Sequence, residues 1–134
     1  MNDSPESRQI RASSLCETIL GAAIEVHRTL GPGLLESAYR DCLCHELYYR
    51  GVTHDRERTL PLRYRDVIVN CGYRLDIVVE DFVIVEIKSV RAIERVHRAQ
   101  LLTYLKLTGL PVGLLLNFNV ALLKDGIARM VNNL

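Results

Sequence analysis

The sequence predicts an α/β domain with a mixed, mainly antiparallel sheet flanked by helices. Near the start of the chain apolar residues recur every three or four positions, whereas from Val52 to Val90 they follow the alternating pattern of strands. A further helical segment then precedes an apolar run, and a helix that connects two strands of one sheet makes them parallel. With 134 residues, of which 49% are hydrophobic, the chain has the size of one domain with one core.

Two helices open the predicted domain. Residues 1–12 are polar and mixed in charge, so we expect a flexible N-terminal arm there and a single domain over residues 13–134. The first helix is predicted from apolar residues at helical spacing, namely Leu15, Ile19, Ala22, Val26 and Leu30. The Gly31–Gly33 turn contains a proline and ends this helix, and the second helix runs to Gly51, a residue suited to a helix C-terminus.

Short strands are predicted between the second helix and Val90. Turn-forming residues separate four segments with strand character, which are Thr59–Tyr64, Val67–Val69, Tyr73–Val79 and Val83–Ile87. A third helix is predicted over Ile93–Leu107, because a glycine and then a proline follow it. The apolar run Val112–Phe118 is typical of a strand covered on both faces, and Ile127–Val131 is predicted as a short edge strand.

Composition and charge exclude several classes of protein. A net charge of +1 with 25% charged residues excludes a disordered chain and a strongly basic one, although 14 of the 17 basic residues are arginines, which suit bidentate phosphate contacts. Apolar stretches fall well short of the roughly 20 residues of a membrane span, and no secretory leader pattern is present. We therefore expect a cytoplasmic protein with no membrane partner. The four cysteines are sparse, so we expect no disulfides.

Charged residues interrupt two of the predicted strands. Asp76 lies within an apolar strand, and Glu86 and Lys88 share one face of the next, because side chains alternate along a strand. A three-residue loop over Glu80–Phe82 places Asp76 directly opposite Glu86, whereas a two-residue loop puts them on opposite faces. A functional interpretation of the pair therefore requires the three-residue loop or a bulge.

Two interpretations of these charges remain open at this point. Converging carboxylates beside a lysine are what a Mg²⁺ or Mn²⁺ site with hard oxygen ligands requires, and the lysine could orient a water and stabilise charge on a phosphate. In the alternative, Lys88 simply neutralises Asp76 or Glu86 in a buried ion triad.

Further polar residues lie on or near the apolar faces of the predicted helices. Glu36, at the edge of the second helix's stripe, could reach a metal at the sheet, whereas Glu46 is expected to pair with an arginine. Gln100 and Tyr104 are four residues apart and are predicted to face inward, where they could hold a phosphate; a satisfied polar pair under the core is the alternative. The other side of the third helix is expected to be a solvated face, formed by Arg91, Arg95, Arg98 and Lys106.

A short motif links the chain to a known family. The segment Gly31–Tyr39 contains the signature Gly-x-x-Glu-x-x-Tyr, and from about Leu15 to Val131 the chain resembles the small GxxExxY proteins of the PD-(D/E)XK nuclease superfamily. The superfamily hallmark is an Asp on one strand and Glu-x-Lys on the next, and Asp76 and Glu86-Ile87-Lys88 match it. The resemblance implies a PD-(D/E)XK, restriction-endonuclease-like core.

The resemblance also extends to residues outside the two strands. Glu36 matches an upstream helical acid of the superfamily, and Gln100 and Tyr104 match a Gln-x-x-x-Tyr motif of exonuclease-type members. The proline of the superfamily's name is absent, since Arg74 and Leu75 precede the aspartate.

Together these features predict a metal-dependent nuclease that hydrolyses DNA, or less readily RNA, with a metal-activated water. We expect Asp76, Glu86 and Glu36 to ligate Mg²⁺ or Mn²⁺, Lys88 to act beside them, and Gln100 and Tyr104 to support the substrate. The alternative is a catalytically silent nuclease-fold module that binds nucleic acid or protein. A homodimer is compatible with either.

Overall fold

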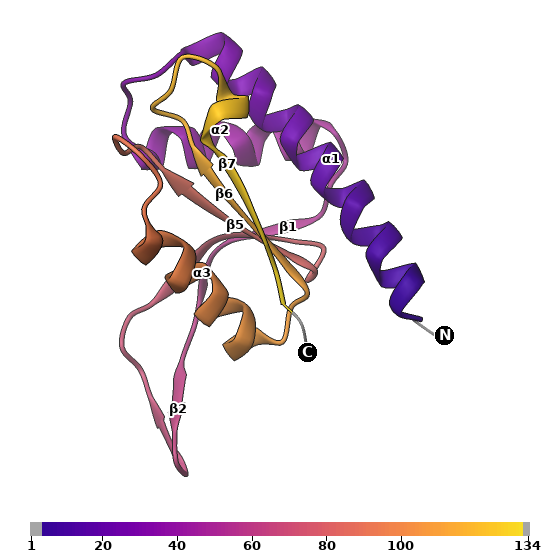
Figure 1. Cartoon of the computed structure of the whole chain (residues 1–134), viewed down its shortest axis with the longest axis vertical. Helices are drawn as coiled ribbons and strands as arrows, with labels where there is room; N and C mark the ends of the chain where they lie inside the picture. The colour runs from indigo at the N-terminus through magenta and orange to yellow at the C-terminus, as the bar shows by residue number, and fades with distance from the viewer. Residues whose placement is uncertain (1–3, 133–134) are drawn as a thin grey trace.

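A computed structural model describes residues 4–132 and shows a mixed sheet with helices on both faces (Figure 1). In chain order the elements are α1 (Pro5–Leu30), α2 (Glu36–Tyr49), β1 (His54–Thr59), β2 (Leu62–Tyr64), β3 (Val67–Val69), β4 (Arg74–Val79), β5 (Val83–Lys88), α3 (Arg95–Thr108), β6 (Val112–Asn117), the 3₁₀ turn η1 (Leu123–Gly126) and β7 (Ile127–Val131). The five-stranded sheet has the order β1-β4-β5-β6-β7. This confirms the predicted fold class.

Strand pairing follows the predicted pattern of hairpins and one crossover. β4 and β5 are antiparallel, with Val79 paired to Val83 across the three-residue loop that the functional interpretation requires. β5 and β6 are parallel because α3 connects them, and β7 is an antiparallel edge strand on β6. β5 and β6 are buried on both faces, because the side chains on each face of these strands belong to the core.

The core is divided by the sheet into two parts. One part joins α1 and α2 to the sheet, and Tyr39 stacks on Phe118 within it with ring centroids 4.5 Å apart. The other part lies under α3, where Leu101 and Leu105 pack on Leu115 of β6. None of the helices in the described part of the chain combines the length and apolar character needed to cross a membrane.

The first helix begins earlier than the apolar pattern predicts. Residues 1–12 were expected to form an arm, but the helix already starts at Pro5; residues 1–3 lie outside the described range. Ser4 caps the helix because its side chain accepts a hydrogen bond from the Ser7 amide, and proline fits the first helical position. Most side chains in the first two turns of α1 are exposed, so burial of apolar residues does not explain where the helix begins. The Ser4 cap therefore determines the start of α1.

The predicted strand Thr59–Tyr64 contains β2 but shares only Thr59 with β1, so the part of β1 from His54 to Arg58 was not predicted as a strand. Pro61 has no amide hydrogen to donate, and it separates β1 from β2. β2 and β3 then form their own two-stranded sheet, which continues the β1 and β4 ribbon away from the body of the molecule (Figure 1). The predicted turn at Arg65 and Asp66 connects these two strands, and Arg65 has a φ of 56°.

Candidate active site

Two carboxylates replace the backbone pairing where β4 and β5 separate. The backbone ladder between these strands runs from Val79 and Val83 to Ile77 and Val85. In the next position, the Asp76 amide donates to Glu86 Oε2 at 2.9 Å. The Ile87 amide in turn donates to Asp76 Oδ2 at 2.8 Å. Each side chain is therefore held by the opposite strand, and the two carboxylates lie together as the sequence predicts.

Burial raises the pKa of both carboxylic acids. Glu86 is 5% exposed, and its pKa is raised to about 8, mainly by burial and then by the charge of Asp76. The pKa of Asp76 is raised as well, because burial outweighs the bond from the Ile87 amide and the nearby charge of Arg40. The site thus contains two partly buried acids whose charged forms a bound cation would stabilise.

Lys88 does not form the buried ion triad that one interpretation predicts. Within residues 4–132 no ion pair of 4.0 Å or less joins Lys88 to Asp76 or Glu86. Its side chain is half-buried, and its charge lowers the pKa of both acids without neutralising either by contact. The contact with Asp76 comes instead from Arg40, whose Nη1 lies 3.7 Å from Asp76 Oδ1.

Glu36 lies in the first turn of α2 and contacts the segment after β5. Its Oε2 accepts a hydrogen bond from the Ser89 amide at 3.1 Å, and Ser89 Oγ donates to the Leu34 carbonyl at 2.7 Å. The Tyr39 hydroxyl donates to the Gly31 carbonyl at 2.6 Å and accepts from the Leu34 amide at 3.1 Å. The Gly-x-x-Glu-x-x-Tyr motif thus fixes the turn before α2, and this turn carries Glu36 to the end of β5.

Only one residue of the predicted inward pair on α3 is buried. The buried face of α3 consists of Leu101, Tyr104 and Leu105, and the pKa of Tyr104 is raised by burial and then by the charge of Glu86. Gln100 is exposed, which corrects the prediction that it faces inward. It lies about 90° around the helix from the centre of the narrow buried face. The predicted solvated face is confirmed, since its four basic residues are exposed: Arg91, Arg95, Arg98 and Lys106.

Arg40 is a member of this site that the sequence analysis missed. It lies one helical turn after Glu36, and its side chain is 19% exposed. Besides Asp76, its guanidinium contacts Glu57 on β1. Its helical spacing from Glu36 indicates that Arg40 lies on the same side of α2 as that acid. The sequence does not show, however, which acid on the sheet Arg40 contacts. The expected ion pair of Glu46 is present, with Arg50 at 3.0 Å.

Asn117 is a second missed residue, and it fixes the backbone beyond Lys88. Asn117 is 1% exposed and is the register partner of Lys88 in the parallel pair of β5 and β6. Its Nδ2 donates to the Val90 carbonyl at 3.0 Å, and its Oδ1 accepts from the Val90 amide at 3.1 Å. A single amide side chain in the apolar run Val112–Phe118 was the signal that could have identified it.

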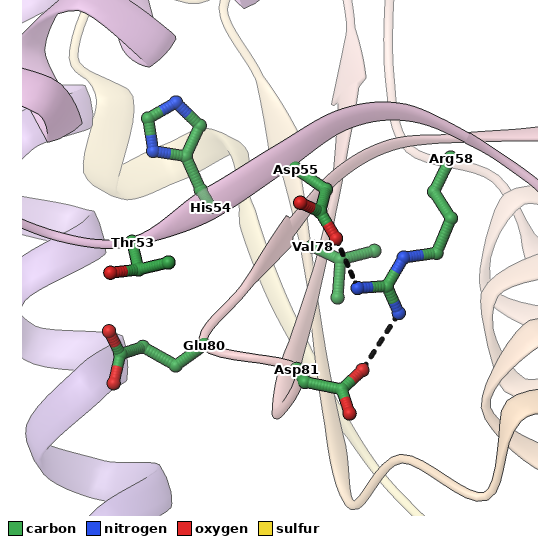
Figure 2. A pocket seen from close by; sticks show the side chains of 7 residues that line it. All are labelled: Thr53, His54, Asp55, Arg58, Val78, Glu80 and Asp81. Atoms are coloured by element: carbon green, nitrogen blue, oxygen red, sulfur yellow. Dashed lines mark hydrogen bonds and ion pairs between the residues drawn. The ribbon is translucent and has the colours of Figure 1, made fainter.

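A polar pocket of about 330 Å³ lies at the other end of β4, away from the acidic pair (Figure 2). Arg58 reaches across it and donates to Asp55 and to Asp81, so its charge is already matched. The pocket lining includes none of the site residues predicted from the sequence, and we assign it no role in the chemistry.

The fold and the site together define a class of protein. A mixed sheet flanked by helices, with an acid on one strand and Glu-x-Lys on the neighbouring strand, is the arrangement of a nuclease domain. A model of the PD-(D/E)XK nuclease superfamily matches residues 13–130. The chain therefore belongs to the PD-(D/E)XK nuclease superfamily. No curated protein and no solved structure gives a significant match.

The acidic pair supplies donors that fit a divalent ion, which nucleases of this superfamily generally use. Asp76 Oδ1 and Glu86 Oε1 receive no hydrogen bond from the residues that the structure describes. Over residues 4–132 no group of three or more His, Cys, Asp or Glu side chains is arranged to hold a metal, so Glu36 does not complete a three-acid site, although its charge raises the pKa of both acids. Two carboxylates suit an ion such as Mg²⁺, which keeps several water ligands.

Proposed function

We propose that this protein is a divalent-metal-dependent nuclease of the GxxExxY group that hydrolyses phosphodiester bonds in DNA, with RNA as the less favoured substrate. The observation that supports this proposal is the convergence of Asp76 and Glu86 where their strands separate, with Lys88 alongside and unpaired with either acid over residues 4–132. Burying two acids together is costly, and a structural ion triad that would offset this cost is not formed by Lys88.

Asp76 and Glu86 would hold Mg²⁺ or Mn²⁺. Glu36, which contacts the Ser89 amide just after β5, could bind the ion through a water molecule. When bound, the ion would lower the pKa of a water and neutralise charge on the phosphate. The Lys88 ammonium, which no carboxylate within 4.0 Å neutralises among the described residues, would orient the attacking water and stabilise negative charge on the phosphate. Asn117 would keep Lys88 in place through its two bonds to Val90.

The third helix would border the substrate. Tyr104 lies close enough to Glu86 for their charges to interact, and its ring is 6.3 Å from that of Tyr73. Gln100 is exposed on the Tyr104 side of α3, where it would contact a bound strand instead of supporting the site from within.

A homodimer would place two such sites on the two strands of a duplex. Light scattering of the purified protein would measure whether it is a monomer or a dimer.

The test is cleavage by the purified chain of single- and double-stranded DNA and RNA in Mg²⁺ or Mn²⁺. Asp76→Asn keeps an acceptor for the Ile87 amide, and Lys88→Ala removes the ammonium together with the methylene groups that carry it. Each should lower the rate at least about 100-fold. Lys106→Ala, on the exposed face of α3, is the matched control and should cleave at the wild-type rate.

Two outcomes contradict the proposal. Cleavage that survives unchanged in both site variants would identify a contaminating nuclease. A wild-type protein that binds nucleic acid or protein, but cleaves none of the four substrates with either ion, would be the catalytically silent binding module.

A further inference from the structure

Arg40 connects three elements around the acidic pair. Its Nη1 lies 3.7 Å from Asp76 Oδ1 on β4, and its Nη2 lies 3.1 Å from Glu57 Oε1 on β1. A third contact, from Nε to Asp41 Oδ1 at 3.8 Å, stays on α2. The guanidinium is therefore shared by several acids, and it contacts the same Asp76 oxygen that receives no hydrogen bond.

Glu57 occupies an unusual position opposite Asp76. The pairing of β1 with β4 joins Arg56 to Ile77 and Arg58 to Leu75, which leaves Glu57 across from Asp76 without a ladder pair. Glu57 also has a φ of 52°, a left-handed conformation that is rare for a residue other than glycine, asparagine or aspartate. This local distortion accompanies the contact of Glu57 with Arg40.

The hydrogen bonding of Arg40 is incomplete although its side chain is largely enclosed. Its Nε is buried and has no hydrogen-bond partner among the described residues. A donor left unsatisfied inside a protein costs free energy, so hydrogen bonding alone is a poor account of this position. A role in placing a positive charge beside Asp76 explains the buried position of Arg40 better, because the guanidinium stays charged in proteins.

We infer that Arg40 is a built-in counter-cation of the acidic site: it holds the Asp76 side chain when no metal is bound, and a divalent ion must compete with it. This inference rests on the proposed function, since it takes Asp76 as a metal ligand. Two cations that share one carboxylate oxygen repel each other, so Arg40 sets how tightly the site binds metal. Glu57 draws the guanidinium partly away and so moderates this competition.

Mn²⁺ binding to the full chain, measured by titration calorimetry at one pH, tests the inference without any cleavage assay. Arg40→Gln removes the charge and should bind Mn²⁺ about tenfold more tightly than the wild type. Arg40→Lys keeps the charge and should stay within about threefold of it. Arg50→Gln is the matched control, because Arg50 directly follows α2 and its ion pair with Glu46 shares no acid with Arg40; it should leave the affinity unchanged.

A second variant keeps the inference open to test if Arg40→Gln fails to fold. Glu57→Gln removes the acid that draws Arg40 away from Asp76, so Mn²⁺ should bind more weakly than to the wild type. The inference is overturned if folded Arg40→Gln binds Mn²⁺ no more tightly than the wild type, if neither protein binds it, or if Glu57→Gln binds it more tightly. Tighter binding by Arg40→Gln in a protein that cleaves no nucleic acid would uphold the inference and refute the proposed function.

Discussion

The buried Glu86 makes the metal-free protein less stable as the pH rises. Its pKa is about 8 in the folded chain, against an ordinary value of 4.5. Between these values the folded state keeps a proton that the unfolded state has released, so raising the pH favours unfolding. The difference corresponds to roughly 3 to 5 kcal/mol of unfolding free energy, present below about pH 4.5 and lost as the pH rises through 8.

The substitution Glu86→Gln should remove this dependence. The amide oxygen of glutamine can still accept the Asp76 backbone hydrogen bond, and the side chain carries no charge at any pH. Urea unfolding between pH 5 and pH 8 in the presence of a chelator measures the effect. Relative to the wild type, the variant should gain roughly 3 kcal/mol across this range, which is about 10 °C in Tm for a chain of 134 residues.

The control for this experiment is Glu17→Gln, on the exposed side of α1. Its stability should follow the wild-type curve at every pH, because Glu17 is exposed and its side chain forms no hydrogen bond or ion pair with the residues that the structure describes. Wild-type and Glu86→Gln curves that stay parallel from pH 5 to pH 8 would refute the reasoning. Mn²⁺ should stabilise the wild type at pH 8 more than the variant, since binding to the native state alone raises stability.

Two further predictions concern the supports of the site. Tyr39→Phe removes the hydroxyl that donates to the Gly31 carbonyl, and it should lower the unfolding free energy by about 1 to 2 kcal/mol; a loss below 0.3 kcal/mol in urea titrations would show that water replaces the bond. In Gly126→Ala the added Cβ would lie 2.1 Å from the Asn117 carbonyl oxygen, so the backbone must move, at a cost of about 3 kcal/mol. A wild-type Tm for this variant would mean that η1 shifts freely.

Local patterns were sufficient to predict the two strands that contain the acidic pair. The charges at Asp76 and Glu86 are conspicuous because they interrupt apolar strands, and strand alternation with loop length then determines which residues face each other. Most of β1 was missed because its sequence, His54–Thr59, is polar and shows no apolar alternation. The predicted strand instead ran through Pro61, which has no amide hydrogen to donate.

The supporting residues could not be predicted in the same way. The roles of Arg40 and Asn117 depend on partners in distant elements, such as Asp76 and Val90, so local spacing can single out the two residues but not show what they contact. Gln100 was placed wrongly because helical periodicity shows which residues share a side, but the width of the buried face depends on how much of the helix the sheet covers.

The crossed bonds between β4 and β5 tie the architecture of the sheet to its chemistry. Asp76 and Glu86 each accept a hydrogen bond from a main-chain amide of the opposite strand, and the side-chain oxygen of asparagine or glutamine could do the same. Selection for a folded protein alone would therefore preserve an oxygen acceptor at each position, but not its charge. The Lys88 side chain has no comparable structural role, since no carboxylate among the described residues lies within 4.0 Å of its ammonium. Under the proposed function, loss of the Lys88 ammonium, or of the charge at Asp76 or Glu86, would therefore mark related sequences that keep the fold without cleavage.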